Sequence, residues 1–167
     1  MKELPEDVID NLVTEWKQER PELDASAMYI VGRILKLGKL LEKRAGQVLK
    51  DSGIHYTDLD VLATLRRSGE PYELTPKELM RSVLITSGAM TALLDRLTKL
   101  NLIYRAPDKR DGRIKRAGLT KKGRKVIDKA IEIRFDEAKE SLCALNKTEK
   151  ESLAVLLKKM LFDISLD

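Results

Sequence analysis

Ten basic side chains crowd into the segment 105–125, and the chemistry they suit is the binding of phosphate. Only Asp108 and Asp111 oppose them, so this segment carries a charge of +8, whereas the whole chain carries +5. A cationic patch on a nearly neutral body is typical of a nucleic-acid-binding protein. An ordinary solvated surface is the alternative. The ten residues are Arg105, Lys109, Arg110, Arg113, Lys115, Arg116, Lys121, Lys122, Arg124 and Lys125.

The residue types that most enzymes need are scarce. His55 is the single histidine and Cys143 the single cysteine, which leaves no cluster of such ligands for a metal and no disulfide within one chain. There is no glycine-rich phosphate loop, and a Ser-His-Asp set would require chance use of His55. We therefore expect no enzymatic activity and no cofactor. Because Cys143 lies among apolar residues of an expected helix, it is expected to be a buried, inert thiol.

Two short helices joined by a tight turn are predicted just before the basic segment. Residues 75–78, Thr-Pro-Lys-Glu, form a capping box with proline at the first helical position. The sequence Thr86-Ser87-Gly88 starts the second helix, and Asn101 can supply its left-handed end. This pair is a helix-turn-helix candidate. The buried face of the second helix would consist of Met90, Leu93, Leu94, Leu97 and Leu100.

A β-hairpin is expected to follow this pair. Short strands at 102–105 and 114–119 enclose a charged, turn-rich segment, so the hairpin would have a basic tip. Thr57 is the expected N-cap of a helix to residue 68, with Asp60 as the acid of its first turn. The expected fold class is therefore all-α with a small β-hairpin wing. The other helices are expected at 6–20, from 24 or 26 to about 50, from 120 to about 145, and after 146.

These elements group into three regions of one intertwined domain. Residues 1–50 and 124–167 would supply dimerisation helices, and 51–123 a winged helix-turn-helix lobe that binds DNA. The terminal helices carry apolar stripes that the middle region alone cannot cover, so a two-fold homodimer is expected. No run of eighteen apolar residues occurs and the first ten residues lack an apolar core segment, so we expect no membrane contact and a cytoplasmic protein.

The outward face of the second helix supplies the expected DNA contacts. With Leu94 and Leu97 turned inward, its outward residues are Ser87, Ala89, Thr91, Ala92 and Arg96. Such a helix fits the major groove, where small residues permit close approach and Arg96 would meet a phosphate. In the wing, Lys109, Arg110 and Arg113 are candidates for phosphate or minor-groove contact. Asp111 would repel DNA and is expected to stabilise the wing by pairing with a neighbouring arginine.

The segment 74–125 resembles the MarR family of bacterial regulators. The resemblance is carried by Leu74 to Leu79, by Thr86 to Thr91, by the wing sequence DKRDGR at 108–113 and by LTKKG at 119–123. It implies a winged helix-turn-helix protein that binds double-stranded DNA. One wing position departs from the family, because Gly112 stands where relatives commonly have arginine. The resemblance therefore implies a sequence-specific transcription regulator, a repressor binding an inverted-repeat operator as a homodimer, with a winged-helix protein-interaction module as the alternative.

The N-terminal part is similar to the urate-responsive branch of that family. Trp16 and Asp60 stand at two positions which that branch associates with its ligand, and His55 just precedes Asp60. The resemblance thus implies a possible ligand pocket at Trp16, His55 and Asp60, through which a small-molecule effector would release DNA. Where the branch has an Asn-Arg pair, this chain has Ala92-Leu93. We therefore expect either no response to urate or a response to a different ligand. The alternative is a vestigial pocket, with DNA binding controlled by another input. Core packing for Trp16 and a first-turn acid for Asp60 remain the alternatives.

Overall fold

The computed structural model describes residues 4–82, 87–108 and 111–165. The chain divides into two compact units, Met1–Arg44 and Ala45–Asp167, which are described separately below. Within the described ranges, no helix is long and apolar enough to cross a membrane.

The first unit is built on helix α1 (Val8–Glu19) and most of helix α2 (Met28–Val48). Asp7 caps α1, because its Oδ1 accepts from the backbone N–H groups of Ile9 and Asp10. Arg33 of α2 then pairs with Asp7 at 2.8 Å and with Asp10 at 2.6 Å. Ile9 packs against Gly32, where an added Cβ would come within 3.0 Å of its Cδ1. Two contacts therefore join the helices: the ion pairs of Arg33 with Asp7 and Asp10 at the start of α1, and the packing of Ile9 against Gly32.

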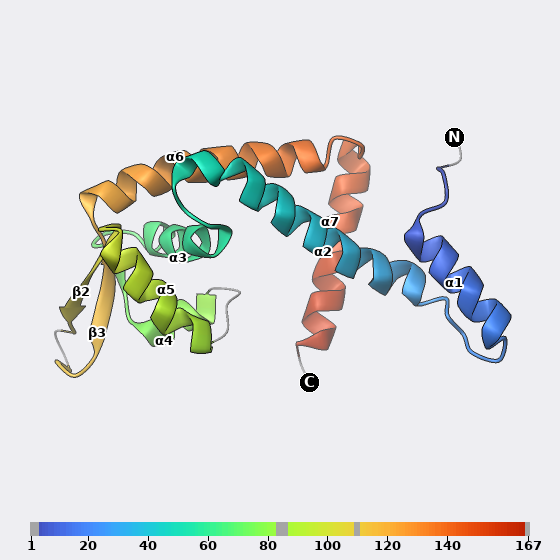
Figure 1. Ribbon diagram of the computed structural model, residues 1–167, viewed down its shortest axis with the longest axis horizontal. Helices are drawn as coiled ribbons and strands as arrows, with labels where there is room; N and C mark the ends of the chain where they lie inside the picture. Colours follow the sequence, from blue (N-terminus) through green and yellow to red (C-terminus); the bar gives the residue numbers. More distant parts are fainter. Residues whose placement is uncertain (1–3, 83–86, 109–110, 166–167) are drawn as a thin grey trace. The chain divides into compact units, whose positions relative to one another are not determined.

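The second unit encloses the main core, which draws on every helix from the end of α2 to α6. Its helices are α3 (Tyr56–Arg67), α4 (Pro76–Ser82), α5 (Ser87–Lys99), α6 (Lys121–Ser141) and α7 (Lys147–Ile164), with a short 3-10 turn at Lys50–Ser52. Helix α6 lies alongside α3 (Figure 1). Fully buried side chains include Leu49, Leu62, Leu65, Leu79, Leu94, Leu97, Ile103 and Ile127.

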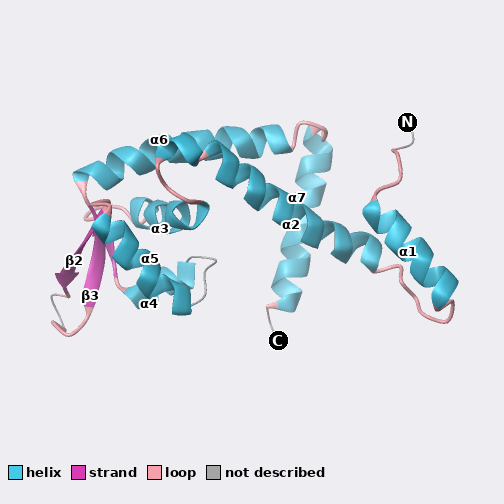
Figure 2. Cartoon of the chain, viewed as in Figure 1, coloured by secondary structure: helices cyan, strands magenta, loops and turns pink. Residues whose placement is uncertain are grey.

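A three-stranded antiparallel sheet has one strand before the helix-turn-helix pair and two after it, and the two later strands are drawn in Figure 2. Its strands are β1 (Glu73–Leu74), β2 (Ile103–Pro107) and β3 (Lys115–Leu119), in the order β1-β3-β2. The hairpin expected from the sequence is confirmed, with Tyr104 opposite Gly118 and Arg105 opposite Ala117. Strand β1 was not expected, because two residues are too few to show strand periodicity.

Both caps predicted around α4 and α5 are confirmed. Thr75 Oγ1 accepts from the Glu78 N–H at 3.2 Å, and Glu78 Oε2 accepts from the Thr75 N–H at 2.7 Å. At the end of α5, Asn101 adopts a φ of 57°. This left-handed residue lets the Leu102 N–H reach the Leu97 carbonyl at 3.0 Å, which ends the helix.

The expected cap of α3 was wrong by two residues. Helix α3 begins after His55, so Asp58, rather than Asp60, is the acid of its first turn. The Oδ2 of Asp58 accepts from the His55 N–H at 2.7 Å. Asp60 lies two residues further along, beyond the first turn, and is half-buried. The buried carboxylate of Asp58 therefore provides the acceptor for the backbone N–H at the start of α3. Thr57, the expected N-cap, lies exposed within the first turn.

The expected burial of Cys143 was also wrong. Helix α6 ends at Ser141, four residues earlier than expected, and Cys143 is exposed in the turn before α7. The carbonyls of Lys139 and Glu140 accept from the N–H groups of Leu142 and Cys143, so the backbone tightens into a turn there. Asn146 then caps α7 in a capping box with Glu149, as the sequence indicates.

Candidate nucleic-acid interface

Helix α5 presents the face that the sequence predicts for DNA. Leu93, Leu94 and Leu97 are buried in the core, whereas Ala89, Thr91 and Ala92 are exposed. The first residue of α5 is Ser87, whose side chain lies outside the described part, as does Thr86. The outer surface of α5 is therefore small and weakly polar, which suits close approach to base edges.

Arg96 lies at the edge of this face, and one of its nitrogens is turned inward. Its Nη2 stands 3.0 Å from Oδ2 of Asp58, a side chain with no exposed surface. The Arg96 side chain as a whole stays 38% exposed. The structure thus assigns Arg96 an ion pair that connects α5 to the start of α3. A phosphate contact by the remaining nitrogens stays a prediction.

The wing turn is organised by two aspartates. Asp108 Oδ1 accepts from the Asp111 N–H at 3.2 Å, and Asp111 Oδ1 accepts from the Arg113 N–H at 3.1 Å. Arg113 Nε also lies 3.3 Å from Asp111 Oδ1, while the Arg113 side chain is 93% exposed. Arg113 is thus available to DNA in the described part of the wing. Lys109 and Arg110 lie outside the described residues.

The basic segment is less cationic at the surface than its composition indicates. The Arg105 atoms Nε and Nη1 are buried, with no hydrogen-bond partner in the described ranges. Arg116 is enclosed by carboxylates, as described below, and Arg124 stacks on the ring of Tyr72 at 5.0 Å. Lys122 Nζ donates to the Leu100 carbonyl at 2.9 Å at the end of α5. Four of the ten basic side chains are therefore buried or held in contacts within the protein, which a count of charges does not reveal.

The LTKKG sequence at the start of α6 holds this helix against the end of α5. Thr120 Oγ1 accepts from the Gly123 N–H at 2.9 Å and donates to the Asn101 carbonyl at 2.8 Å. A Cβ on Gly123 would lie 1.9 Å from the Leu102 carbonyl oxygen, which is closer than any real contact. Only glycine fits there, so the motif serves to set the ends of α5, β2 and α6 together.

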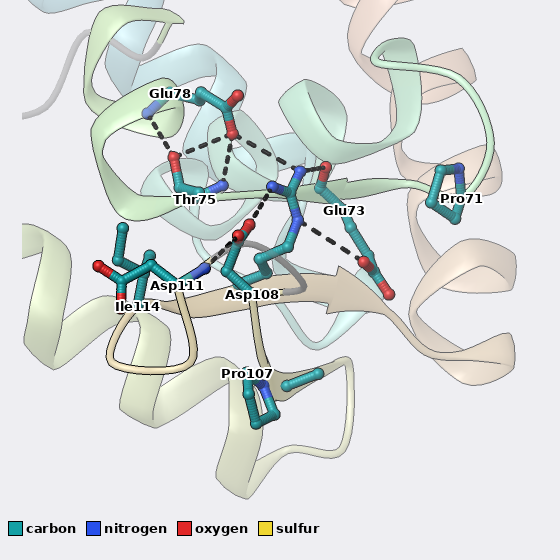
Figure 3. A pocket seen from close by; sticks show the side chains of 10 residues that line it. Pro71, Glu73, Thr75, Glu78, Pro107, Asp108, Asp111 and Ile114 are labelled. Atoms are coloured by element: carbon teal, nitrogen blue, oxygen red, sulfur yellow. Dashed lines mark hydrogen bonds and ion pairs between the residues drawn. The ribbon is translucent and has the colours of Figure 1, made fainter.

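An acidic pocket lies at the base of the wing (Figure 3). Its volume is about 670 Å³, and among the described residues four carboxylates and one cation, Arg116, line it. The remaining lining is formed by Pro71, Thr75, Ala106, Pro107 and Ile114. Sequence reasoning missed this pocket, because its four acids are scattered over β1, α4 and the wing turn: Glu73, Glu78, Asp108 and Asp111.

The three residues of the predicted ligand pocket are divided between the two units. Trp16, on α1 of the first unit, is 49% exposed. His55 and Asp60 belong to the second unit, at the N-cap and in the first turns of α3. The ligand pocket therefore stays a prediction.

Comparison with known proteins bears directly on this arrangement. The sequence model of the MarR family matches residues 52–114, which run from before α3 into the wing. The uncharacterized HTH-type transcriptional regulator YkoM of Bacillus subtilis is 32% identical over 110 residues, which are 66% of this chain and 70% of that protein. This chain belongs to the MarR family. It is a DNA-binding transcription regulator with a winged helix fold, and not an enzyme.

Other transcriptional regulators are similar to this chain over a greater part of its length. The HTH-type transcriptional regulator PecS of Dickeya dadantii is 29% identical over 149 residues, 89% of this chain and 90% of its own. A mutant of E. coli MarR, solved with operator DNA, shows 26% identity and a TM-score of 0.73, with coverage of 83% and 99%. The organohalide-sensing regulator RdhR, solved with 2,4-dichlorophenol, gives a TM-score of 0.75 at 22% identity, with coverage of 84% and 82%, and so shares the fold.

Proposed function

We propose that this MarR-family regulator is a repressor that binds an inverted-repeat operator as a homodimer. The observation that carries the proposal is the outer face of α5, where Ala89, Thr91 and Ala92 are exposed while the opposite face is buried in the core. The major groove of B-DNA admits one helix, and a hydroxyl there can read a base edge. A mutant of E. coli MarR, which shares this fold, has been solved with operator DNA, and this supports binding of DNA by the present chain.

The wing supplies the second contact of the proposed complex. Arg113, almost fully exposed, would reach a phosphate or the adjacent minor groove. Lys115, Lys121 and Lys125 are exposed on β3 and the first turns of α6 and add positive charge. These contacts fix the position of the protein on the duplex, whereas Thr91 and the alanines contribute sequence preference.

The proposed homodimer is supported by the apolar surface that the single chain leaves uncovered. No residue of α7, which is described over its whole length, is buried. Its exposed large apolar residues are Leu153, Val155, Leu156, Leu157, Leu161, Phe162 and Ile164. Monomers rarely expose apolar surface on this scale, and a two-fold partner covers the same face on both copies. Two copies of α5 would then meet successive major grooves about 34–36 Å apart.

Thr91 tests the proposed reading of DNA. The Thr91→Val variant keeps the shape of the side chain but loses its hydroxyl, so we expect about a tenfold loss of affinity for the preferred duplex. The matched control is Thr98→Val on the same helix, whose hydroxyl donates to the Leu94 carbonyl at 2.8 Å. Fluorescence anisotropy with a duplex selected by the wild-type protein measures the affinity of each variant. Equal losses in the two variants would contradict the assignment of Thr91.

Phe162 tests the homodimer. Phe162 is 69% exposed in the single chain, so Phe162→Glu should leave the fold intact and prevent association by placing a charge in the interface. Sedimentation velocity should show a monomer, and operator affinity should fall by about a hundredfold or more, because two half-sites no longer act together. Lys158→Glu on the same helix is the control for the change of charge. A Phe162→Glu protein that stays dimeric would exclude α7 from the interface.

Release of DNA by a small molecule is the third part of the proposal. Its support is the resemblance of Trp16 and Asp60 to the urate-responsive branch, and the solved RdhR structure, which holds 2,4-dichlorophenol. Ala92-Leu93 replaces the Asn-Arg pair of that branch, so urate should leave the operator complex intact. Titrating the complex with urate and with 2,4-dichlorophenol distinguishes the two ligands. Dissociation by urate would contradict the inference drawn from Ala92-Leu93.

A further inference from the structure

Arg116 lines the acidic pocket, and its guanidinium reaches four acceptors on Glu73, Glu78 and Asp108. The shortest contact is from Nη1 to Asp108 Oδ2 at 2.8 Å, followed by Nη2 to the Glu73 carbonyl at 2.9 Å. Nε lies 3.6 Å from Glu73 Oε2, and Nη2 lies 3.7 Å from Glu78 Oε2. The Arg116 side chain is only 24% exposed. Its charge is therefore directed into the protein.

The partners of Arg116 come from parts of the fold that must stay in register for DNA recognition. Arg116 itself lies on β3, and Glu73 lies on β1. Glu78 belongs to the first turn of α4, which opens the helix-turn-helix, and Asp108 follows β2 at the entry to the wing turn. One side chain thus connects the wing to the helix-turn-helix.

The carboxylates are themselves held in place, so the network has a defined geometry. Glu78 Oε2 accepts from the backbone and the hydroxyl of Thr75, at 2.7 and 2.9 Å. These hydrogen bonds to Thr75, together with the charge of Arg116, hold the pKa of Glu78 below its ordinary value, which keeps it ionised. Glu73 Oε1 accepts from the Tyr104 hydroxyl on β2. Asp108 Oδ1 accepts from the Asp111 N–H, so its two oxygens join the wing turn to Arg116.

We propose that Arg116 is a positioning residue for operator recognition, which sets the angle of the wing relative to α4 and α5 without touching DNA. The planar guanidinium, with five donors in a fixed fork, can satisfy acceptors from several directions at once. A lysine ammonium is a compact point charge and cannot reproduce that fork. The competing interpretation is that Arg116 belongs to the basic surface and binds phosphate. The two interpretations predict different behaviour in salt.

The test compares Arg116→Lys, Arg116→Met and Arg113→Met on two DNA duplexes. The first is a duplex that the wild-type protein selects from a random library, and the second is an unrelated duplex of equal length. Affinities are measured over a range of salt concentrations. Arg113→Met should bind both duplexes more weakly and lower the salt slope by about 1, as loss of a phosphate contact does.

For Arg116 we expect a different pattern. Both Arg116→Lys and Arg116→Met should bind the selected duplex about tenfold more weakly, with the affinity for unrelated DNA and the salt slope unchanged. Loss of folding alone would weaken binding to both duplexes equally, so the ratio of the two affinities isolates positioning. If Arg116→Met does not fold, Asp108→Asn keeps the shape of the side chain, weakens the shortest ion pair and should lower the same ratio.

Two results would overturn the inference. Wild-type affinity in Arg116→Lys, together with a lower salt slope in Arg116→Met, would make Arg116 a phosphate contact. An unchanged ratio of affinities in Arg116→Met and Asp108→Asn would remove any role in recognition. The inference rests on the proposed function, but different results would contradict each of them. A wild-type protein that selects no duplex contradicts the proposed function, whereas selection by the wild type with unchanged variants contradicts only the role of Arg116.

Discussion

Replacing Gly123 by alanine should lower the free energy of unfolding by about 3 kcal/mol, because the added methyl group has no space. Its Cβ would lie 1.9 Å from the carbonyl oxygen of Leu102 and 2.8 Å from the carbonyl carbon. Both are backbone atoms, so no change of rotamer relieves the clash. The same carbonyl accepts from the Thr120 N–H at 3.1 Å, so a shift of Leu102 would also loosen the cap of α6. Urea unfolding followed by circular dichroism measures the loss.

Gly38→Ala is the matched control for this experiment. Gly38 lies within α2, and an added Cβ there meets no described atom within 4 Å. Alanine favours a helix over glycine, so this variant should be more stable by up to about 1 kcal/mol. The proposed role of Gly123 would be contradicted if Gly123→Ala unfolded at the same urea concentration as the wild type.

Replacing Arg96 by methionine should also lower the free energy of unfolding by about 3 kcal/mol, since it leaves the carboxylate of Asp58 without its cation. Asp58 has no exposed surface, and its Oδ1 has no hydrogen-bond partner among the described residues. A buried charge that loses its partner is among the costlier single changes. Because Arg96 itself is 38% exposed, water screens the pair in part, and we expect the lower end of the usual range.

Lys99→Met provides the control for Arg96→Met, since Lys99 is an exposed cation in the last turn of the same helix. The control should change the stability by less than about 0.5 kcal/mol. Arg96→Met should combine with Asp58→Asn non-additively in the double variant, because the second change removes the charge that the first one strands. Equal effects of Arg96→Met and Lys99→Met would show that the pair contributes little.

The elements of the binding lobe could be predicted because their signals are local. The capping box at Thr75 and Glu78, the left-handed Asn101 and the apolar spacing of α5 each depend on residues within one or two turns of each other. The same is true of the β2–β3 hairpin, whose two strands enclose a short turn. Local sequence preference and tertiary structure agree at these points.

The parts that could not be predicted depend on contacts between distant residues. Arg116 meets the carbonyl of Glu73, which is 43 residues away in the sequence, so counting charges placed it on the surface. Strand β1 exists only because β3 pairs with it. Asp58 and Asp60 lie two residues apart near the start of α3, and Asp58 is the one in the first turn, where it is buried against Arg96. In each case the partner, rather than the local sequence, decides the outcome.

Quantitative footprinting on selected DNA tests the central claim, that α5 and the wing bind a specific operator. The wild-type protein is incubated with a random duplex library, and the recovered duplexes are footprinted with hydroxyl radicals. The account predicts a short inverted repeat, with the DNA backbone protected in two symmetric patches about one helical turn apart, and a weaker preference in Thr91→Val. Binding without any enriched sequence, or no binding at low salt, would contradict the account and favour a winged-helix module that contacts other proteins.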